Sequence, residues 1–582
     1  MPAPLQSLQI PVIRGLTDYP EHAQPGEAEI CYNIDLSSHS GLTRGGVAFH
    51  GSSTNRAVQI GANTQPYPTG LWHFRSKRGA LYEIRGIADE DGRGQLRANF
   101  GIGGDLSHSF DLPGFGLDHL AKWQGVEFVD RFVVATAYNQ DDNNRTLYSF
   151  SPNQGFTALP AIDRTVSPLH GSAMFWGVDG DDEGPYLDKP PKATLLTSMN
   201  GRLYAAGLHE ERDALRYSNF LDPEGWPGNN IIRVKTKDGA AITGLGSIAN
   251  NLVVFKERSI HMGWVKSQYD ANMRKVVDGV GCINADTIEN VGDSLIFLGE
   301  DGVYLFGGSG ITPLSQKIEK RLRALKPVFS MACAGYYRKK AQYWIAFPSG
   351  RYYNGKISDL VFVYDLRRKE WAEYRFNATS SDGDAVSIAV PHAGFGAFSS
   401  VLSRGGSEHF IGAGLSGENL FPEQAHFVRY FRFDAQEKDD GIDYDGSEAQ
   451  MRVESSWQSA SIVLGEHPCR RFDSLRTVFA GIHSERTHVW WLLDSESRLD
   501  AERYDQSADI DGEGDYQPRR VTNFGALDVF DSALWSNPDP YSDKLLLHGA
   551  QGRTIRIGLE TKHKHGLDIR SLQLDTRTLS KW

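Results

Sequence analysis

The chain has 582 residues, of which 40% are hydrophobic and 23% charged, a composition typical of globular proteins. Its 61 Lys and Arg against 73 Asp and Glu give a net charge of −12, which excludes a protein that wraps nucleic acid through a basic surface. The four cysteines are widely spaced and form no Cys-x-x-Cys pair, so a disulfide framework and a zinc site are disfavoured. We expect free thiols in a reducing compartment.

Residues 1–50 form the first segment. They lack the basic and apolar parts of a signal peptide, and the chain contains no apolar run near the roughly 20 residues of a membrane span. The segment is rich in Pro, Gly and polar residues and has too few apolar side chains for a core of its own. We therefore predict an extended N-terminal arm that adds to a larger unit.

Residues 51–404 repeat one short pattern, a strand-like hexad bounded by polar turns. Its six copies lie at 80–85, 131–136, 202–207, 251–256, 294–299 and 342–347. The second residues of successive copies are 51, 71, 49, 43 and 48 positions apart. A period of roughly 40 to 50 residues built from short strands is typical of propeller blades. The pattern predicts an all-β fold, a β-propeller of about six blades, with an insertion near residues 171–192 in the longest interval.

Four of the hexads are followed by another strand-like run at a similar offset. These runs lie at 214–219, 259–264, 302–307 and 360–365. Two of the connections are short and charged, at 256–258 and 300–302, as expected of tight hairpins. We interpret the units as blade hairpins, with one blade completed by distant strands.

The rest of the chain holds one predicted helix and a second β-rich region. Apolar residues spaced four and three apart predict a helix over 315–326, which Pro327 should end. From residue 405 to 582, acidic clusters alternate with short β-like runs. We predict a β-rich C-terminal region that completes blades or forms a platform.

Metal and phosphate chemistry receive little support. The acidic runs 179–183 and 509–513 could offer carboxylates to calcium, but neither follows the order of a calcium-binding loop, and we interpret both as solvated loops. His209 begins a zincin-like triplet, but the residue four positions later is Asp213. The glycine-rich stretches 101–104 and 394–396 are not followed by Lys-Ser/Thr. We predict no catalytic, metal-binding or cofactor-binding residues, and no cofactor.

A glycan hydrolase would need two carboxylates facing one cleft. The scattered acids that could reach the propeller axis lie in turns or at strand ends, where acids are common. They are Asp293, Glu300, Asp301 and Asp365. The chain also lacks the repeated Ser-x-Asp-x-Gly-x-Thr-Trp box of sialidases. We therefore predict a protein that is not an enzyme and keep the hydrolase as the weakest alternative.

The tryptophans allow a second alternative. Trp72, Trp123 and Trp344 fall in or near predicted strands, where large rings pack between twisted blades. Trp490 and Trp491 must point to opposite faces of a strand, so one ring would be exposed. An exposed ring would serve as a subunit contact or a ligand platform, as in a host-receptor or glycan-binding propeller.

Two sets of residues resemble a known family. In the arm these are Gly15-Leu16-Thr17, Pro20, Pro25-Gly26-Glu27, Asn33 and Gly41-Leu42-Thr43-Arg44-Gly45-Gly46. They resemble the opening of the tail nozzle proteins, or tail tubular protein B, of short-tailed bacteriophages, although the last turn is one residue shorter here and lacks the family's Pro. A second set is similar to the propeller core shared by phage tail virion proteins. It comprises Tyr217-Ser218-Asn219, 222–226, 252–260, 279–282 and 297–304.

The resemblance implies a structural virion component of the phage tail, assembled in the host cytoplasm. Identical subunits would form a ring of six, a homohexamer, that docks on the tail adaptor and forms or gates the distal channel for DNA ejection. Tail fibres or spikes and the host cell surface would be further partners. Genomic DNA would pass through the lumen without sequence-specific binding, and the charge of −12 suits such a passage.

Overall fold

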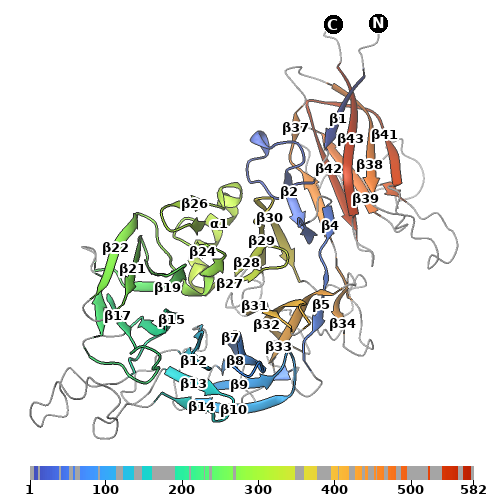
Figure 1. The fold of residues 1–582 in the computed structure, drawn as a ribbon. Coiled ribbons are helices and arrows are strands. Elements are labelled where there is room, and N and C mark those ends of the chain that lie inside the picture. The colour runs from blue at the N-terminus through green and yellow to red at the C-terminus, as the bar shows by residue number, and fades with distance from the viewer. Residues whose placement is uncertain are drawn as a thin grey trace, which may run out of the picture.

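The computed structural model describes residues 5–10, 13–37, 41–51, 57–58, 66–89, 92–112, 122–136, 147–159, 190–208, 211–228, 230–234, 239–266, 270–347, 360–376, 395–403, 405–417, 426–435, 439–442, 451–453, 455–463, 470–479, 487–493, 522–524, 541–561 and 568–578. Of the insertion expected near residues 171–192, residues 171–189 lie outside these ranges. Two β units make up the described chain, a propeller and a sandwich (Figure 1).

Five propeller blades are antiparallel sheets of four consecutive strands. Blades 1 and 2 are β7 (Pro66–Arg75), β8 (Leu81–Asp89), β9 (Gly94–Phe100) and β10 (Leu106–Leu112), then β11 (Gln124–Phe128), β12 (Arg131–Ala135), β13 (Leu147–Ser151) and β14 (Gly155–Ala158). Blade 3 is β15 (Leu195–Met199), β16 (Arg202–Ala206), β17 (Ala214–Tyr217) and β18 (Ile231–Arg233). Blade 4 is β19 (Ile242–Ile248), β20 (Asn251–Lys256), β21 (Ser259–Val265) and β22 (Ala271–Asp278). Blade 5 is β23 (Glu289–Val291), β24 (Ser294–Leu298), β25 (Val303–Phe306) and β26 (Ile311–Pro313).

Two further blades close the ring. Blade 6 is β27 (Cys333–Tyr337), β28 (Gln342–Phe347), β29 (Leu360–Asp365) and β30 (Glu370–Arg375). Blade 7 is β31 (Phe395–Leu402), β32 (Glu408–Gly417), β33 (His426–Ala435) and, from the arm, β5 (Gly46–Phe49). The short strands β6 (Ala57–Val58), β34 (Asp439–Ile442) and β35 (Met451–Arg452) extend its outer edge.

The propeller class is confirmed, and the described residues give seven blades where about six were expected. All six predicted hexads form the second strand of a blade. Strand β31 packs against β27 on one side and β7 on the other, so blade 7 closes the ring. The division expected after residue 404 falls inside blade 7, between β31 and β32.

The sandwich consists of two facing sheets. One contains β1 (Leu5–Ile10), β3 (Ile34–Asp35), β4 (Gly41–Thr43), β38 (Arg470–Phe479), β41 (Tyr541–Gly552) and β43 (Asp568–Thr578). The other contains β36 (Ser455–Ser459), β37 (Ile462–Val463), β39 (Thr487–Leu493), β40 (Thr522–Phe524) and β42 (Thr554–Thr561). Leu475 and Leu574 from the first sheet share a buried cluster with Ile557 from the second. This core is what makes the C-terminal region a folded unit.

The predicted helix is shorter than expected. The α-helix α1 covers Glu319–Leu325, and 3₁₀ turns at Gln316–Ile318 and Lys326–Met331 flank it. Pro327 does not end the helical run, because it stands in the first turn of the second 3₁₀ segment, where a missing N–H costs no hydrogen bond.

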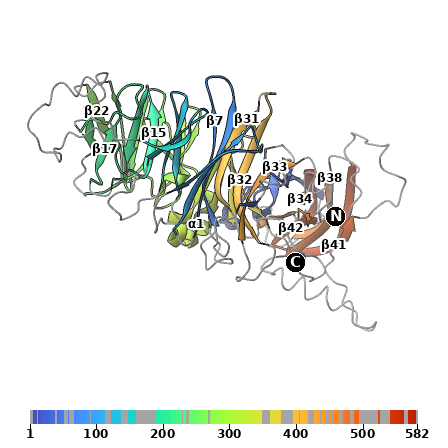
Figure 2. The same ribbon diagram turned by 90° about the horizontal axis from the view of Figure 1, so that it is seen from below.

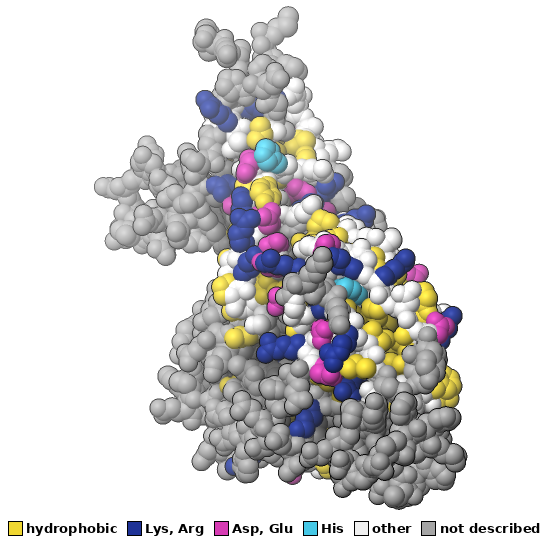
Figure 3. Space-filling model, turned by 90° about the vertical axis from the view of Figure 1, so that its left-hand side faces the viewer, with side chains coloured by type: hydrophobic (Ala, Val, Ile, Leu, Met, Phe, Trp, Pro, Cys, Tyr) yellow, Lys and Arg dark blue, Asp and Glu magenta, His cyan; other side chains and the backbone are white. Residues whose placement is uncertain are grey.

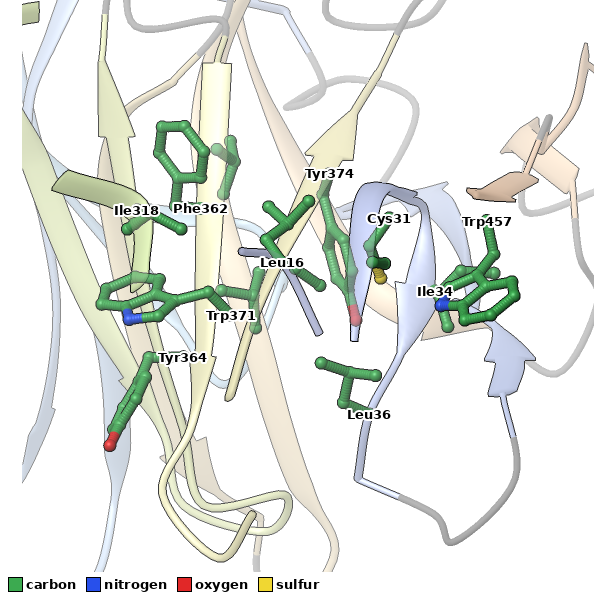
Figure 4. Packing of buried hydrophobic residues seen from close by; sticks show 14 of the residues in the cluster. Leu16, Cys31, Ile34, Leu36, Ile318, Phe362, Tyr364, Trp371, Tyr374 and Trp457 are labelled. Atoms are coloured by element: carbon green, nitrogen blue, oxygen red, sulfur yellow. The ribbon is translucent and has the colours of Figure 1, made fainter. Parts of the chain in front are cut away.

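The N-terminal arm joins the two units. Strand β2 (Ala28–Tyr32) pairs in parallel with β30 of blade 6 and antiparallel with β36 of the sandwich. One sheet of ten strands therefore runs from blade 6 into the sandwich. Leu16, Cys31 and Ile34 from the arm are buried between Trp371 of blade 6 and Trp457 of the sandwich (Figure 4).

Candidate functional site

A cavity lies on the propeller axis. Its volume is about 330 Å³, and its lining comes from the first strands of five blades, β7, β11, β23, β27 and β31, and from residues just before β11 and β23. A cavity of this size has room for a small molecule.

Asp286 is the first of two carboxyl groups in this cavity. Its position is set by Asn284, whose side chain accepts a hydrogen bond from the Asp286 backbone N–H (3.0 Å) and donates to the Ala332 carbonyl oxygen (2.9 Å). Gln124 Nε2 donates to Asp286 Oδ1 at 2.6 Å. Burial raises the pKa of Asp286 to about 7, against the opposing charge of Lys122 and the Gln124 hydrogen bond.

Glu289 is the second carboxyl group in the cavity lining. Burial raises its pKa to about 8, with Arg338 acting in the opposite direction. Both pKa values lie near neutral pH, so the two carboxyl groups can exchange protons with a small polar guest. Sequence reasoning missed both residues. Glu289 begins the first strand of blade 5 and Asp286 lies in the 3₁₀ turn Ala285–Thr287 just before it, so their position relative to that strand is the signal that could have found them.

The four acids considered for glycan hydrolysis are absent from the cavity lining. Glu300 pairs with Arg258 at 3.0 Å and Asp301 pairs with Lys326 at 2.7 Å, both at exposed turns. Asp365 Oδ1 accepts the backbone N–H groups of Arg367 and Arg368, so it organises a turn. Asp293 is exposed between β23 and β24. These positions do not form a catalytic pair.

Other predicted features have mixed outcomes. Trp491 is buried in the sandwich core, whereas the side chain of Trp490 lies outside the described residues.

The acidic runs 179–183 and 509–513 and the residue His209 also lie outside the described residues. Among the side chains that are described, no group of three or more His, Cys, Asp or Glu is placed to hold a metal ion. No helix in the described part of the chain is long and apolar enough to span a membrane.

A buried ionic cluster holds blades 7 and 1 together where the ring closes. Glu83 on β8 is fully buried and accepts hydrogen bonds from Arg85 Nε at 2.6 Å and from His50, which follows β5, at 2.6 Å. The Arg85 guanidinium stacks on the ring of Tyr430 in blade 7 at 3.6 Å. Burial alone would raise the pKa of Glu83, but Arg85 and His50 hold it well below its ordinary value.

Three of the arm residues that resemble the phage family have structural roles at the junction. A side chain at Gly15 would meet the backbone of Trp371. Glu27 pairs with Lys317 beside α1 at 2.6 Å. Asn33 has a positive φ of 55°.

Asn33 and Arg44 connect the arm to the edge of blade 6. The Asn33 side-chain oxygen accepts hydrogen bonds from Arg44 Nε and from the Arg375 backbone N–H, both at 2.9 Å. The Arg44 guanidinium lies 4.3 Å from the ring of Phe376. Close packing, ion pairing and a left-handed turn thus explain why Gly, Glu and Asn occupy these positions.

Comparisons with known proteins identify no family. No protein-family model and no curated protein matches this chain. The chain is similar to the WD40 domain of Neurospora crassa Pan2, with 9% identity, a TM-score of 0.34 and coverage of 63% of this chain and 89% of that one. It is also similar to the N-terminal domain of Nup159 (10% identity, TM-score 0.32, coverage 69% and 99%) and to a puromycin hydrolase mutant (11%, 0.32, 67% and 58%). The assignment to the propeller class rests on the strand topology described above.

Proposed function

We propose that this protein is a structural component of a phage virion, a tail nozzle whose subunits form a ring around the DNA-ejection channel. The observation that carries the proposal is the arm. Four of its residues that resemble the nozzle family, Gly15, Glu27, Asn33 and Arg44, pack against blade 6 or pair with the segment beside α1. The comparisons with known proteins do not bear on this role.

Continuity between the two units suits a part that bears load. The arm adds strands to both sandwich sheets and to blade 7, and its Asp18 pairs with Arg321 of α1 at 2.6 Å. Because β2 lies inside one sheet, the propeller and sandwich cannot separate without breaking strand pairing. A subunit of this kind transmits force between a docking surface and a channel wall without bending at a linker.

Electron microscopy of the purified chain tests the proposal. We expect ring-shaped particles in which each subunit shows a disc and an attached lobe, alone or after addition of the tail adaptor. Particles that remain single subunits under both conditions would contradict the proposal.

A further inference from the structure

The axial cavity contains acceptor atoms that the described part of the chain leaves without partners. Its walls include the first strands of five blades, which cross the propeller from face to face, as β7 and β31 do in the edge-on view (Figure 2). Asp286 Oδ1 accepts the hydrogen bond from Gln124, but Asp286 Oδ2 and both carboxyl oxygens of Glu289 have no hydrogen-bond partner among the described residues. Both side chains are partly exposed and line the cavity, so these oxygens are open to a ligand.

Neither acid has a basic partner at ion-pairing distance within the described residues. Lys122 acts on Asp286, and Arg338 acts on Glu289, from farther away than an ion pair. On the outer side of the propeller, by contrast, acidic and basic side chains are intermingled and in contact with water (Figure 3). A buried charge without a close partner is costly, so an ammonium group brought by a ligand would stabilise the ionised form of either carboxyl group.

Lys122 supplies a hydrogen-bond donor to the same cavity. Its Nζ donates to the Pro68 carbonyl oxygen at 3.3 Å, which is the one hydrogen bond that this ammonium group forms with the described residues. Gly396 of β31 leaves room for it, since a Cβ there would stand 2.9 Å from Nζ. A lysine ammonium group can donate three hydrogen bonds, so donors remain for an oxygen acceptor on a ligand.

An aromatic side chain adds to the lining. Trp72 of β7 is partly exposed and lines the cavity together with Gly70 and Gly125. A Cβ at either glycine would collide with the Trp72 ring, so the ring packs over both glycines at the cavity wall. Indole rings attract ammonium groups. The aromatic ring and the two carboxyl groups therefore favour the same kind of ligand group.

We propose that the axial cavity binds a small hydrophilic molecule that carries a protonated amine and an oxygen acceptor, as amino acids and amino sugars do. The Glu289 carboxylate accepts hydrogen bonds from the amine, and Lys122 donates to the acceptor. The amine belongs at Glu289 because Lys122 neighbours Asp286, whereas Arg338 beside Glu289 is exposed to water. The inference does not depend on the proposed function.

A divalent metal ion is a poorer occupant of the cavity. Such ions take six or more oxygen ligands, and the described residues hold no group of three His, Cys, Asp or Glu placed around one point. The ammonium group of Lys122 would also repel a metal ion at Asp286.

Isothermal titration calorimetry of the full chain at pH 7 tests the inference with two matched pairs of probes. D-glucosamine and D-glucose differ in one group, an amine in place of a hydroxyl, and L-alanine and L-lactate differ in the same way. We expect an aminated probe to bind at least about tenfold more tightly than its hydroxyl counterpart, because hydrogen bonds between charged groups are the stronger ones. The pair that shows this difference assigns the ligand to the amino sugars or to the amino acids.

Three variants locate the site. Glu289→Gln keeps the shape of the side chain and removes its negative form, so it should weaken binding of the aminated probe at least about tenfold. Lys122→Met removes the donor and should weaken binding as well. Asp293→Asn changes an exposed acid in the same blade and is the matched control, which should bind like the unmodified chain. Thermal unfolding of each variant checks that it is folded.

Three results would overturn the inference. Equal binding within each pair of probes would show that the cavity does not recognise an amine. Binding that Glu289→Gln and Asp293→Asn change to the same extent would place the site elsewhere. If neither aminated probe binds the unmodified chain at millimolar concentration, the cavity takes no ligand of this class.

Discussion

Buried acidic residues have opposite effects on stability in two parts of the propeller. Glu83 is ionised in a dry site because Arg85 and His50 compensate its charge. Asp286 and Glu289 line the axial cavity with less compensation, and burial raises the pKa of each. The first arrangement stabilises the ring closure, and the second reduces stability at alkaline pH.

Replacing Glu83 should be costly. Glu83→Gln would leave Arg85 and His50 without their anionic partner in a buried site, and removal of one partner from such a cluster costs about 3–5 kcal/mol. Urea denaturation followed by fluorescence should show this loss. The exposed Glu257→Gln should change the free energy of unfolding by less than about 0.5 kcal/mol. Equal effects in the two variants would contradict a stabilising role for the buried cluster.

The axial carboxyls should make stability depend on pH. Their folded pKa values, about 7 and about 8, lie above ordinary unfolded values, so the folded chain binds more protons between about pH 4 and pH 8. Their contribution to stability is therefore present below pH 4 and is lost as pH rises to 8. Asp286→Asn with Glu289→Gln should flatten this part of the profile and raise stability at pH 9 by at least about 1.4 kcal/mol, the equivalent of one pKa unit. If the double variant leaves the dependence of stability on pH unchanged, the axial carboxyl groups are not its cause.

Among the elements, the N-terminal arm joins the propeller to the sandwich. Gly15 shows how tight this connection is. Gly15→Ala would press a methyl group against the Trp371 backbone, and we expect a loss of about 1–3 kcal/mol, measured as a lower urea midpoint. Gly310→Ala adds the same group to open space at a turn and is the control. Similar midpoints for both variants would show that the arm does not pack tightly.

The six predicted hexads all form blade strands, whereas the predicted number of blades was too low by one. The hexads were visible because each second strand is buried on both faces, as the fully buried β28 shows. Blade 7 was missed because its second strand, β32, does not continue the spacing and its fourth strand, β5, comes from the arm. The axial carboxyls were missed since nothing in the local pattern distinguishes Asp286 from an acid in an ordinary turn. The number of blades, the fourth strand of blade 7 and the burial of the axial carboxyl groups all depend on contacts between segments that are far apart in the sequence.

In the molecule as a whole, the propeller and the sandwich are joined by a sheet of ten strands that runs from blade 6 into the sandwich. If the proposed function is correct, copies of this joined unit assemble into a ring.

Immunogold electron microscopy of virus particles, with antibodies raised against this chain, tests the proposed role in the phage tail. Gold label is expected at the distal end of the tail on intact particles. Label that is absent from the particles, with the protein detected only in the soluble fraction of infected cells, would contradict a role as a tail component.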